Sequence, residues 1–370
     1  MVLFLFLSLI LAFLLAGPKL HLTIQADEPW LSRERTSFVN GFFIILVFIS
    51  HIRQYQLDVT PFETRLIQEL IPNQLIVTTF FFFSGYGLMH SIKAKGRSYV
   101  RAVILRRFPQ LLLNFSVAVL LFAALQAALG HTCSLCHILL SLPGWESVGN
   151  SNWFICMTLL AYLFIFLSFS LLGVQRPYAA VTLVAVLLAL CAPLILLEKD
   201  TYWVDTYLCI PAGMLFSLLK GRMESFFAKT HVPAIAVGLG LLIIGYCLHI
   251  NTAQVYWHLG LPAGAPRLPA MMAGSVVFAL GLTITYGCVT FRMLPRVMVW
   301  MGGAALFPMY IFQRIPMILG HHFEFNQTHT DLYVAGCLVA GMLLAVCFER
   351  IYAWMGHYTL HSEVESAGKP

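Results

Sequence analysis

Long apolar runs alternate with short polar segments along almost the whole chain. Within each run, apolar residues follow one another continuously instead of alternating with polar ones, which indicates helices rather than strands. About 20 apolar residues cross the hydrocarbon core of a bilayer as a helix, and a helix satisfies its own backbone hydrogen bonds. The pattern predicts about ten or eleven membrane spans. We place them at residues 1–18, 37–51, 72–91, 109–130, 153–174, 177–197, 203–219, 232–250, 270–291, 297–319 and 332–353.

The composition excludes a soluble enzyme. Of the 370 residues, 59% are hydrophobic and 10% are charged, whereas soluble domains carry about 25% charged residues. No polar segment between the spans is long enough for a separate soluble domain, so any chemistry must take place within the membrane. The sequence therefore predicts an all-α, polytopic integral membrane helix bundle over 33–353. A hydrophobic anchor and linker precede it over 1–32, and a tail follows over 354–370.

The positive charges are divided unequally between the two sides of the membrane. If residues 19–36 are cytoplasmic and the spans alternate from there, most of the 22 Lys and Arg residues face the cytoplasm. Those left outside or within spans are Arg53, Arg65, Lys199, Arg267 and Arg314. This bias follows the positive-inside rule and places the C-terminus in the cytoplasm and residue 1 outside. The net charge of +6 is thus explained by topology and does not indicate nucleic-acid binding.

The first apolar run also needs an assignment. Met1–Gly17 lacks the basic segment that precedes the apolar part of a secretory signal peptide, and Lys19 follows the run instead. We therefore favour a retained anchor over a cleaved signal. The spans that follow would then form the core of the bundle.

An ionisable group closes the apolar run Asn40–His51 (NGFFIILVFISH), and Arg53 follows shortly after it. Ionisable side chains at membrane depth are costly, so by default they indicate function. An ordinary histidine titrates close to neutral pH and can take a proton from a hydroxyl group, as O-acyl transfer requires. The alternative is an interfacial histidine that extends into the lipid headgroups.

Two further motifs follow downstream. The run Phe80–Met89 reads FFFFSGYGLM, in which Ser84 suits either helix packing or a polar pocket. The segment Lys93–Arg107 is rich in basic residues and ends in the pair Arg106 and Arg107 before Phe-Pro. Such a segment either sets the topology of the chain or binds the phosphates of a ligand through the forked geometry of arginine.

Polar and aromatic side chains also stand out in two later spans. Trp153 opens one of them, which fits either an aromatic belt at the membrane interface or a site. Tyr310, Gln313 and Arg314 lie well inside the other, where polar groups are costly unless they line a cavity or bond between helices. Both interpretations of this group stay open.

Taken in order, these motifs resemble the membrane-bound acyltransferase family 3, whose members are polytopic O-acyltransferases of sugars and cell-surface glycans. The resemblance extends from about residue 33 to about residue 353. It implies that His51 is catalytic and that Arg101, Arg106 and Arg107 bind the donor. The pocket residues that it implies are Asn40, Arg53, Ser84, Trp153, Tyr310, Gln313 and Arg314.

One position departs from the family pattern. The family carries an arginine eleven positions before the histidine, and this chain has Asn40 there. A neutral amide cannot supply the positive charge. Either Arg33, Arg35 or Arg314 supplies it in a rebuilt pocket, which we favour, or the activity is altered or lost.

The resemblance implies an O-acetyltransferase that takes acetyl-coenzyme A from the cytoplasm and modifies a hydroxyl group of a surface or exported glycan. Its partners would be acyl-coenzyme A, a carbohydrate or glycolipid acceptor and the lipid bilayer, in the inner membrane of a bacterium. We expect no permanently bound cofactor and no metal. The alternatives are a transporter or flippase of a glycolipid intermediate, which broken helices and paired buried charges would favour, and a catalytically inactive relative.

The loop His131–His137 contains Cys133 and Cys136 in a CxxCH arrangement, the pattern of a c-type haem attachment site. The loop is short, and the sequence offers no evident distal haem ligand or second pair of zinc ligands. On an oxidising outer face, a local disulfide or two interfacial thiols fits these cysteines better.

Overall fold

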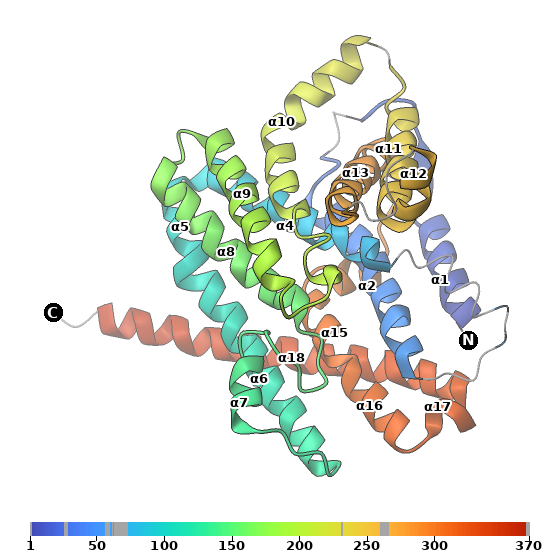
Figure 1. Cartoon of the computed structure of the whole chain (residues 1–370), viewed down its shortest axis with the longest axis vertical. Coiled ribbons are helices and arrows are strands. Elements are labelled where there is room, and N and C mark those ends of the chain that lie inside the picture. The colour runs from blue at the N-terminus through green and yellow to red at the C-terminus, as the bar shows by residue number, and fades with distance from the viewer. Residues whose placement is uncertain are drawn as a thin grey trace.

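In the computed structural model, the described residues are 2–25, 29–55, 60, 62, 73–230, 232–259 and 266–367. This part of the chain is almost entirely helical (Figure 1), and seven of its helices are long and apolar enough to cross a membrane. Its only strands, β1 (Pro18–Leu20) and β2 (Val289–Phe291), are short and pair antiparallel. The prediction of an all-α membrane bundle is therefore confirmed. Arg65, which entered the charge argument, lies outside the described residues.

The helices differ widely in length. In chain order they are α1 (Val2–Leu15), α2 (Arg33–Ile52), α4 (Thr78–Lys95), α5 (Arg97–Ala102), α6 (Phe108–Ala128), α7 (Leu135–Ser141), α8 (Trp153–Leu172), α9 (Pro177–Ile195), α10 (Cys209–Thr230), α11 (Ala234–Ile250), α12 (Thr252–His258), α13 (Leu268–Gly287), α14 (Arg296–Met301), α15 (Leu306–Phe312), α16 (Arg314–His322), α17 (Phe325–Thr328) and α18 (Thr330–Ala367). Short 3₁₀ turns are η1 (Arg53–Tyr55), η2 (Asn73–Val77) and η4 (Thr201–Trp203), and η3 (Val103–Arg107) is a π-helical turn between α5 and α6.

Each predicted span has helix at its position, but not every helix is long and apolar enough to cross a membrane alone. α1 and α11 are shorter apolar helices. α10 is long, yet its second half carries Lys220, Arg222, Glu224 and Lys229. The seven helices that could each cross a membrane are therefore fewer than the ten or eleven spans predicted. Hydropathy alone does not show that a span is shortened, broken or charged over half its length. α18 continues through the predicted tail as far as Ala367.

The predicted span 297–319 is broken into the three short helices α14, α15 and α16. Gly302 follows α14 and lies against α2, where a Cβ atom would overlap the carbonyl oxygen of Ser37. Pro316 lacks the N–H that would continue the backbone hydrogen bonds of α15, and the chain breaks a second time at Gln313. Both α15 and α16 contact α2.

Buried apolar side chains form two clusters. One lies mainly among α4, α8, α9, α10 and α13, and the other mainly among α2, α6, α15 and α18. Trp153 and Phe154, at the start of α8, pack against both clusters. Phe154 also contacts Tyr310 of α15, with the ring centroids 5.4 Å apart. The start of α8 therefore lies at the junction of the two clusters, and so does the candidate site.

Glycines bring the backbones of paired helices into direct contact. α11 and α13 form the most extensive helix pair, and a Cβ atom at Gly274 of α13 would lie 2.7 Å from the backbone nitrogen of His249 in α11. Gly85 of α4 lies in the same way against the Ile210 carbonyl oxygen of α10. Small residues are expected at such interfaces, since helices in lipid associate mainly through close packing.

We expect Gly85→Ala to destabilise the protein, and Gly87→Ala on the same helix to leave its stability unchanged or slightly raised. A methyl group at position 85 would overlap the Ile210 backbone, whereas nothing lies within 4 Å of a Cβ atom at position 87. Overpacking of this kind costs about 1–3 kcal/mol. Thermal unfolding of the purified variants in detergent measures the difference, and equal unfolding temperatures would contradict the close crossing of α4 and α10.

Candidate functional site

His51 lies in the last turn of α2, and its ring reaches Gln313. Nε2 of Gln313 donates a hydrogen bond of 3.0 Å to Nδ1 of His51 and another of 3.1 Å to the carbonyl oxygen of Tyr310. Gln313 is fully buried at the break between α15 and α16. The broken span therefore brings a buried amide to the histidine across 262 residues of sequence.

This hydrogen bond fixes the tautomer of a neutral His51. Because an amide nitrogen only donates, Nδ1 must accept, and the ring proton must be on Nε2. His51 can act as a base through Nε2 only in the opposite tautomer. Oε1 of Gln313 has no hydrogen-bond partner among the described residues. A half-turn of the amide would bring this oxygen to Nδ1 and stabilise the tautomer that a base requires.

His51 faces a cavity of about 430 Å³, the His51 cavity, whose walls include Ser151, Trp153, Tyr310 and Arg314. The rings of His51 and Tyr310 lie 6.0 Å apart between centroids. Arg314 is held from two sides, since Nε donates to Oγ of Ser151 at 2.8 Å and Nη2 donates to the side-chain oxygen of Gln54 at 3.0 Å. Four of the residues that the sequence singled out therefore line one cavity, namely His51, Trp153, Tyr310 and Arg314.

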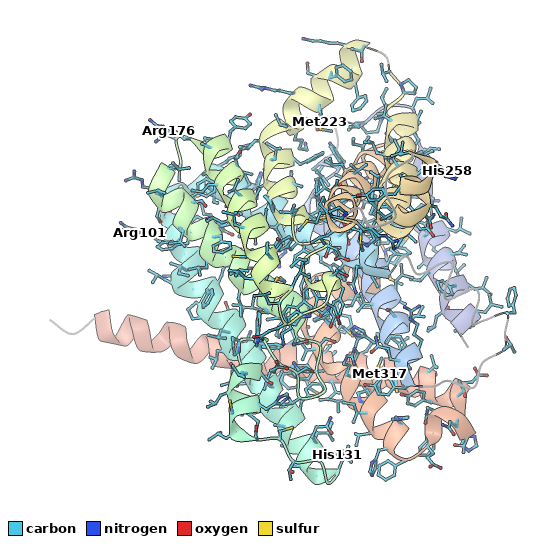
Figure 2. All side chains as sticks on the ribbon, viewed as in Figure 1. Arg101, His131, Arg176, Met223, His258 and Met317 are labelled. Atoms are coloured by element: carbon cyan, nitrogen blue, oxygen red, sulfur yellow. The ribbon has the colours of Figure 1, made fainter. Side chains whose placement is uncertain are left out.

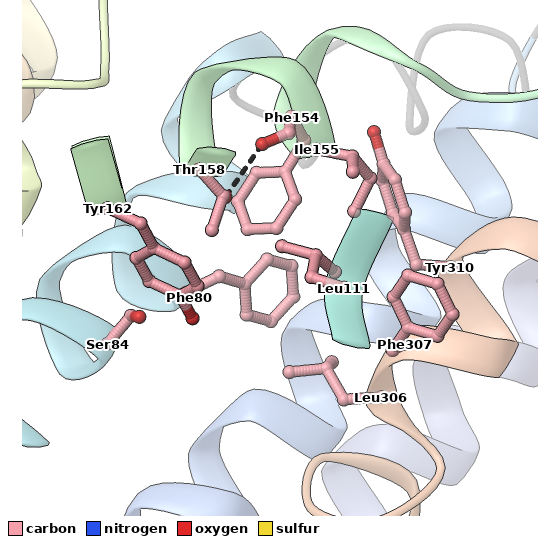
Figure 3. A pocket seen from close by; sticks show the side chains of 10 residues that line it. All are labelled: Phe80, Ser84, Leu111, Phe154, Ile155, Thr158, Tyr162, Leu306, Phe307 and Tyr310. Atoms are coloured by element: carbon pink, nitrogen blue, oxygen red, sulfur yellow. Dashed lines mark hydrogen bonds between the residues drawn. The ribbon is translucent and has the colours of Figure 1, made fainter. Parts of the chain in front are cut away.

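A second cavity of about 180 Å³, the apolar cavity, is also lined by Tyr310 (Figure 3). Aromatic and aliphatic side chains from several helices form most of its wall, and Ser84 lies beside Tyr162 at one end (Figure 3). The Thr158 hydroxyl donates to the Phe154 carbonyl oxygen at 2.7 Å, so this hydroxyl is satisfied within α8. The cavity therefore suits an uncharged group.

A third cavity of about 840 Å³, the basic cavity, is lined by Arg33, His90, Arg107 and Lys220. Ser84 lines both this cavity and the apolar cavity. Guanidinium and ammonium groups in one hollow favour an anionic ligand, above all one that carries phosphates.

The structure separates the three arginines that were expected to bind the donor. Arg107 lines the basic cavity and interacts with the Tyr162 side chain. Arg101 and Arg106 are exposed and do not belong to the described lining of that cavity, and Arg101 lies at the edge of the molecule (Figure 2). The π-helical turn η3 shifts the helical register just before Pro109. Arg106 and Arg107 have different surroundings because adjacent residues of a helix point in different directions, and the sequence does not show which of the two meets the cavity.

The three cavities form a series. The basic cavity and the apolar cavity share Ser84, and the apolar cavity and the His51 cavity share Tyr310. The series begins with positive charge at Arg107, continues between apolar walls and ends at His51. Such an arrangement can hold an anionic molecule at one end, exclude water from an uncharged arm in the middle and present that arm to a histidine.

Asn40 lies outside this series. It is only 8% exposed where α2 crosses α14, and its Oδ1 has no hydrogen-bond partner among the described residues. A Cβ atom at Gly302 would lie 2.6 Å from the Asn40 carbonyl carbon, so the two backbones are in contact at this point. The helix α2 separates Asn40 from His51 by about three turns. The structure therefore does not bring this position to the histidine.

The three arginines considered as substitutes at Asn40 differ in position. Arg33 lines the basic cavity, and Arg314 lines the His51 cavity. Arg35 is buried, with its guanidinium 5.0 Å from the Tyr286 ring centroid and hydrogen-bonded to the Val289 carbonyl oxygen. Arg35 therefore has a structural role between α2 and β2. Arg53 is half-buried beyond the end of α2 and is not part of the described lining of the His51 cavity.

Sequence reasoning missed the polar loop that forms one wall of the His51 cavity. Residues 147–152 (SVGNSN) precede α8, and the Asn150 side chain accepts from the Val148 backbone nitrogen at 3.1 Å. Asn152 donates to the Gly144 and Glu146 carbonyl oxygens at 3.0 Å. The signal was a run of small and polar residues directly before an apolar span.

The CxxCH loop has an ordinary structural explanation. Cys133 and Cys136 are both free thiols, so the disulfide interpretation is wrong, and their position at a membrane interface stays a prediction. His137 is half-buried, and its Nε2 lies 3.0 Å from the Ser147 carbonyl oxygen. Among the described residues, no three His, Cys, Asp or Glu side chains are grouped so that they could hold a metal ion.

Comparisons with protein-family models, with curated proteins and with solved structures found no match to this chain. The family resemblance therefore rests on the motifs quoted above. The functional argument rests on the geometry of the three cavities and on the residues that line them.

We expect Asn40→Arg to impair folding, while Asn40→Ala leaves the protein folded. Position 40 is buried at the contact between α2 and α14, so a guanidinium would have to be desolvated and would force the two helices apart. The yield and monodispersity of each variant in detergent measure the effect. A well-folded Asn40→Arg protein with increased activity would show instead that the site accepts the family arginine.

Proposed function

We propose that this protein is an integral membrane O-acyltransferase that transfers an acyl group, most simply acetyl, from acyl-coenzyme A to a hydroxyl group of a surface or exported glycan. The single observation that carries the proposal is the series of three cavities from Arg107 to His51. The three cavities, in this order, match what the reaction must hold. The basic cavity suits the anionic donor, the apolar cavity suits its thioester arm, and the His51 cavity suits an acceptor that must lose a proton.

The basic cavity supports binding of the donor. Acyl-coenzyme A carries phosphates, and Arg33, Arg107 and Lys220 offer charged donors that can bind them. Its volume of about 840 Å³ is in the range of small-molecule binding sites. In the topology predicted from the positive charges, this cavity opens on the cytoplasmic side, where the donor is made.

The apolar cavity supports passage of the thioester arm. Between Ser84 and Tyr310 its wall is mostly aromatic and aliphatic, so an uncharged acyl thioester fits it better than a hydrated group would. Exclusion of water also protects the thioester from hydrolysis. In this proposal the acyl group reaches the His51 cavity while the charged part of coenzyme A stays in the basic cavity.

The His51 cavity supports the transfer itself. Nε2 of His51 takes the proton of the acceptor hydroxyl as its oxygen forms a bond to the thioester carbonyl carbon. The carbon–sulfur bond then breaks, and the leaving thiolate takes the proton from His51. This step needs the His51 tautomer with its proton on Nδ1, so Gln313 must present Oε1 to the ring during the reaction.

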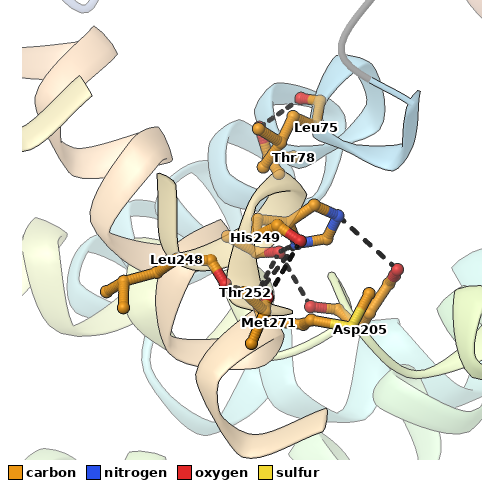
Figure 4. Close-up of polar contacts among 8 residues, drawn as sticks. Leu75, Thr78, Asp205, Leu248, His249, Thr252 and Met271 are labelled. Carbon is orange, nitrogen blue, oxygen red and sulfur yellow. Dashed lines mark hydrogen bonds and ion pairs between the residues drawn. The ribbon is translucent and has the colours of Figure 1, made fainter. Parts of the chain in front are cut away.

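A second candidate, a transporter or flippase of a glycolipid intermediate, is favoured by two other observations. The span over α14, α15 and α16 is broken beside the His51 cavity. Asp205 and His249 are buried, and Oδ2 of Asp205 lies 3.7 Å from Nε2 of His249 (Figure 4). Oγ of Ser275 lies 2.9 Å from Nδ1 of His249. Broken helices and buried ionisable pairs are common in transporters. A requirement for acyl-coenzyme A separates the two functions.

We expect His51→Ala to reduce acyl transfer by about 10²–10⁴-fold, the usual loss when a general base is removed. His258→Ala is the matched control, because this histidine is exposed at the end of α12. Mass spectrometry of surface glycans from cells that carry each variant measures the acetyl ester. Near-normal acetylation by a well-expressed His51→Ala protein would exclude the proposed mechanism.

We expect Arg107→Gln to raise the KM for acetyl-coenzyme A and Arg106→Gln to leave it nearly unchanged. Both arginines are exposed neighbours with the same charge, but only Arg107 belongs to the described lining of the basic cavity. A charge-assisted hydrogen bond contributes about 1.5–3 kcal/mol, which corresponds to roughly a ten- to hundredfold change in KM. Equal effects of the two substitutions would indicate a general electrostatic or topological role for the segment.

A further inference from the structure

A further cavity of about 430 Å³, which we call the histidine cavity, adjoins the His51 cavity. Its walls include Tyr55, His131, His321 and His322, and it shares Arg314 and Gly149 with the His51 cavity. His131 lies at the lower end of the molecule in Figure 2, whereas Arg101 lies at its left edge. The histidine cavity therefore extends the series at its far end, on the side where an exported acceptor would arrive.

Arg314 lies at the boundary between these two cavities and carries a charge that no described residue neutralises. Its guanidinium donates to the neutral side chains of Ser151 and Gln54, and it interacts with the Tyr55 side chain. None of the ion pairs among the described residues includes it. The described linings of the two cavities contain no Asp or Glu. The neutral contacts hold the guanidinium in place without cancelling its charge.

We infer that Arg314 binds an anionic group of the acceptor, so that the acceptor is a sugar bearing a carboxylate or a phosphate. This inference rests on the proposed function, because it concerns the acceptor of that reaction. A guanidinium has five N–H groups in a planar fork, and Nε and Nη2 account for the two hydrogen bonds to Ser151 and Gln54. The interaction with Tyr55 engages a further N–H group, and those that remain can donate to an oxyanion, which arginine binds with well-defined geometry.

The rest of the histidine cavity suits the remainder of a sugar. Tyr55 and His321 lie edge to face with their ring centroids 5.6 Å apart, which offers apolar ring surface together with polar edges. Gln126 contributes an amide beside Gly149, where a Cβ atom would lie 2.7 Å from the amide nitrogen. A sugar anchored by its anionic group at Arg314 would present neighbouring hydroxyl groups to the His51 cavity, because the same arginine lines both cavities.

Ligand-dependent thermal unfolding of the full chain in detergent tests this inference. The probes are glucuronate, glucose 6-phosphate and glucose, compared at equal ionic strength with sodium chloride as the salt control. A ligand that binds the native state raises the unfolding temperature with a saturable dependence on its concentration. We expect a saturable rise with one or both anionic sugars and a much smaller one with glucose or salt. The two anionic probes distinguish a carboxylate from a phosphate.

Substitutions connect the effect to Arg314. Arg314→Gln should abolish the response to the anionic sugars, and Arg314→Lys should retain part of it, since lysine keeps the charge but not the fork. Arg53→Gln is the matched control, because Arg53 belongs to the described lining of neither cavity. If Arg314→Gln is poorly folded, the response of Arg314→Lys decides. An undiminished response in the Arg314 variants, or equal responses to glucose and both anions, would overturn the inference.

The outcome is independent of acyl transfer. The unfolding experiment contains no acetyl-coenzyme A, so it reports binding of the anionic sugar alone. A separate incubation with acetyl-coenzyme A and the sugar tests for the ester product by mass spectrometry. Binding without ester formation in every condition would count against the proposed function, whereas ester formation on neutral sugars alone would count against the assignment to Arg314.

Discussion

The hydrogen bond between Gln313 and His51 depends on the end of α15 at Phe312, in the middle of an apolar run that hydropathy predicts as one continuous span. A continuous helix through residues 296–322 would need the N–H that Pro316 lacks, and the chain also leaves the helix at Gly302, whose backbone lies against α2. Both N–H groups of the buried Gln313 amide then have an acceptor, which is Nδ1 of His51 for one and the Tyr310 carbonyl oxygen for the other. Leaving such donors without partners in the interior would cost about 1–3 kcal/mol each. The break and the histidine therefore stabilise each other.

The series of cavities depends in turn on how the helices cross. Gly85 of α4 faces the α10 backbone, and successive residues of a helix are rotated by about 100° around its axis. Ser84 is thereby turned toward α8, where it interacts with Tyr162 and lines both the basic and the apolar cavity. A packing requirement at one residue thus determines which side chain its neighbour presents to the interior.

Hydropathy was sufficient for the class of fold, because every predicted span contains helix. The cost of polar and ionisable groups at membrane depth drew attention to His51, Gln313 and Arg314. No local pattern indicates that Gln313 meets His51, since the contact joins residues 262 positions apart. Arg106 and Arg107 point in different directions on the same helix, and the sequence does not show which of them meets the basic cavity. Asn40 was expected in the pocket from a motif, but the crossing of α2 with α14 places it elsewhere. These outcomes depend on which backbone a residue meets in three dimensions.

Gln313 and Arg314 are joined by one peptide bond. Gln313 contacts His51, whereas Arg314 lines both the His51 cavity and the histidine cavity. Because the two residues are adjacent, a ligand that shifted the backbone at Arg314 would also shift the amide that selects the histidine tautomer. Ligand occupancy at Arg314 and proton position on His51 would then be thermodynamically linked. By reciprocity, a change in the proton position on the imidazole would alter the affinity at the guanidinium by the same factor. Cooperativity of this kind requires no second domain, only two adjacent side chains of which one contacts the histidine and the other contacts the ligand.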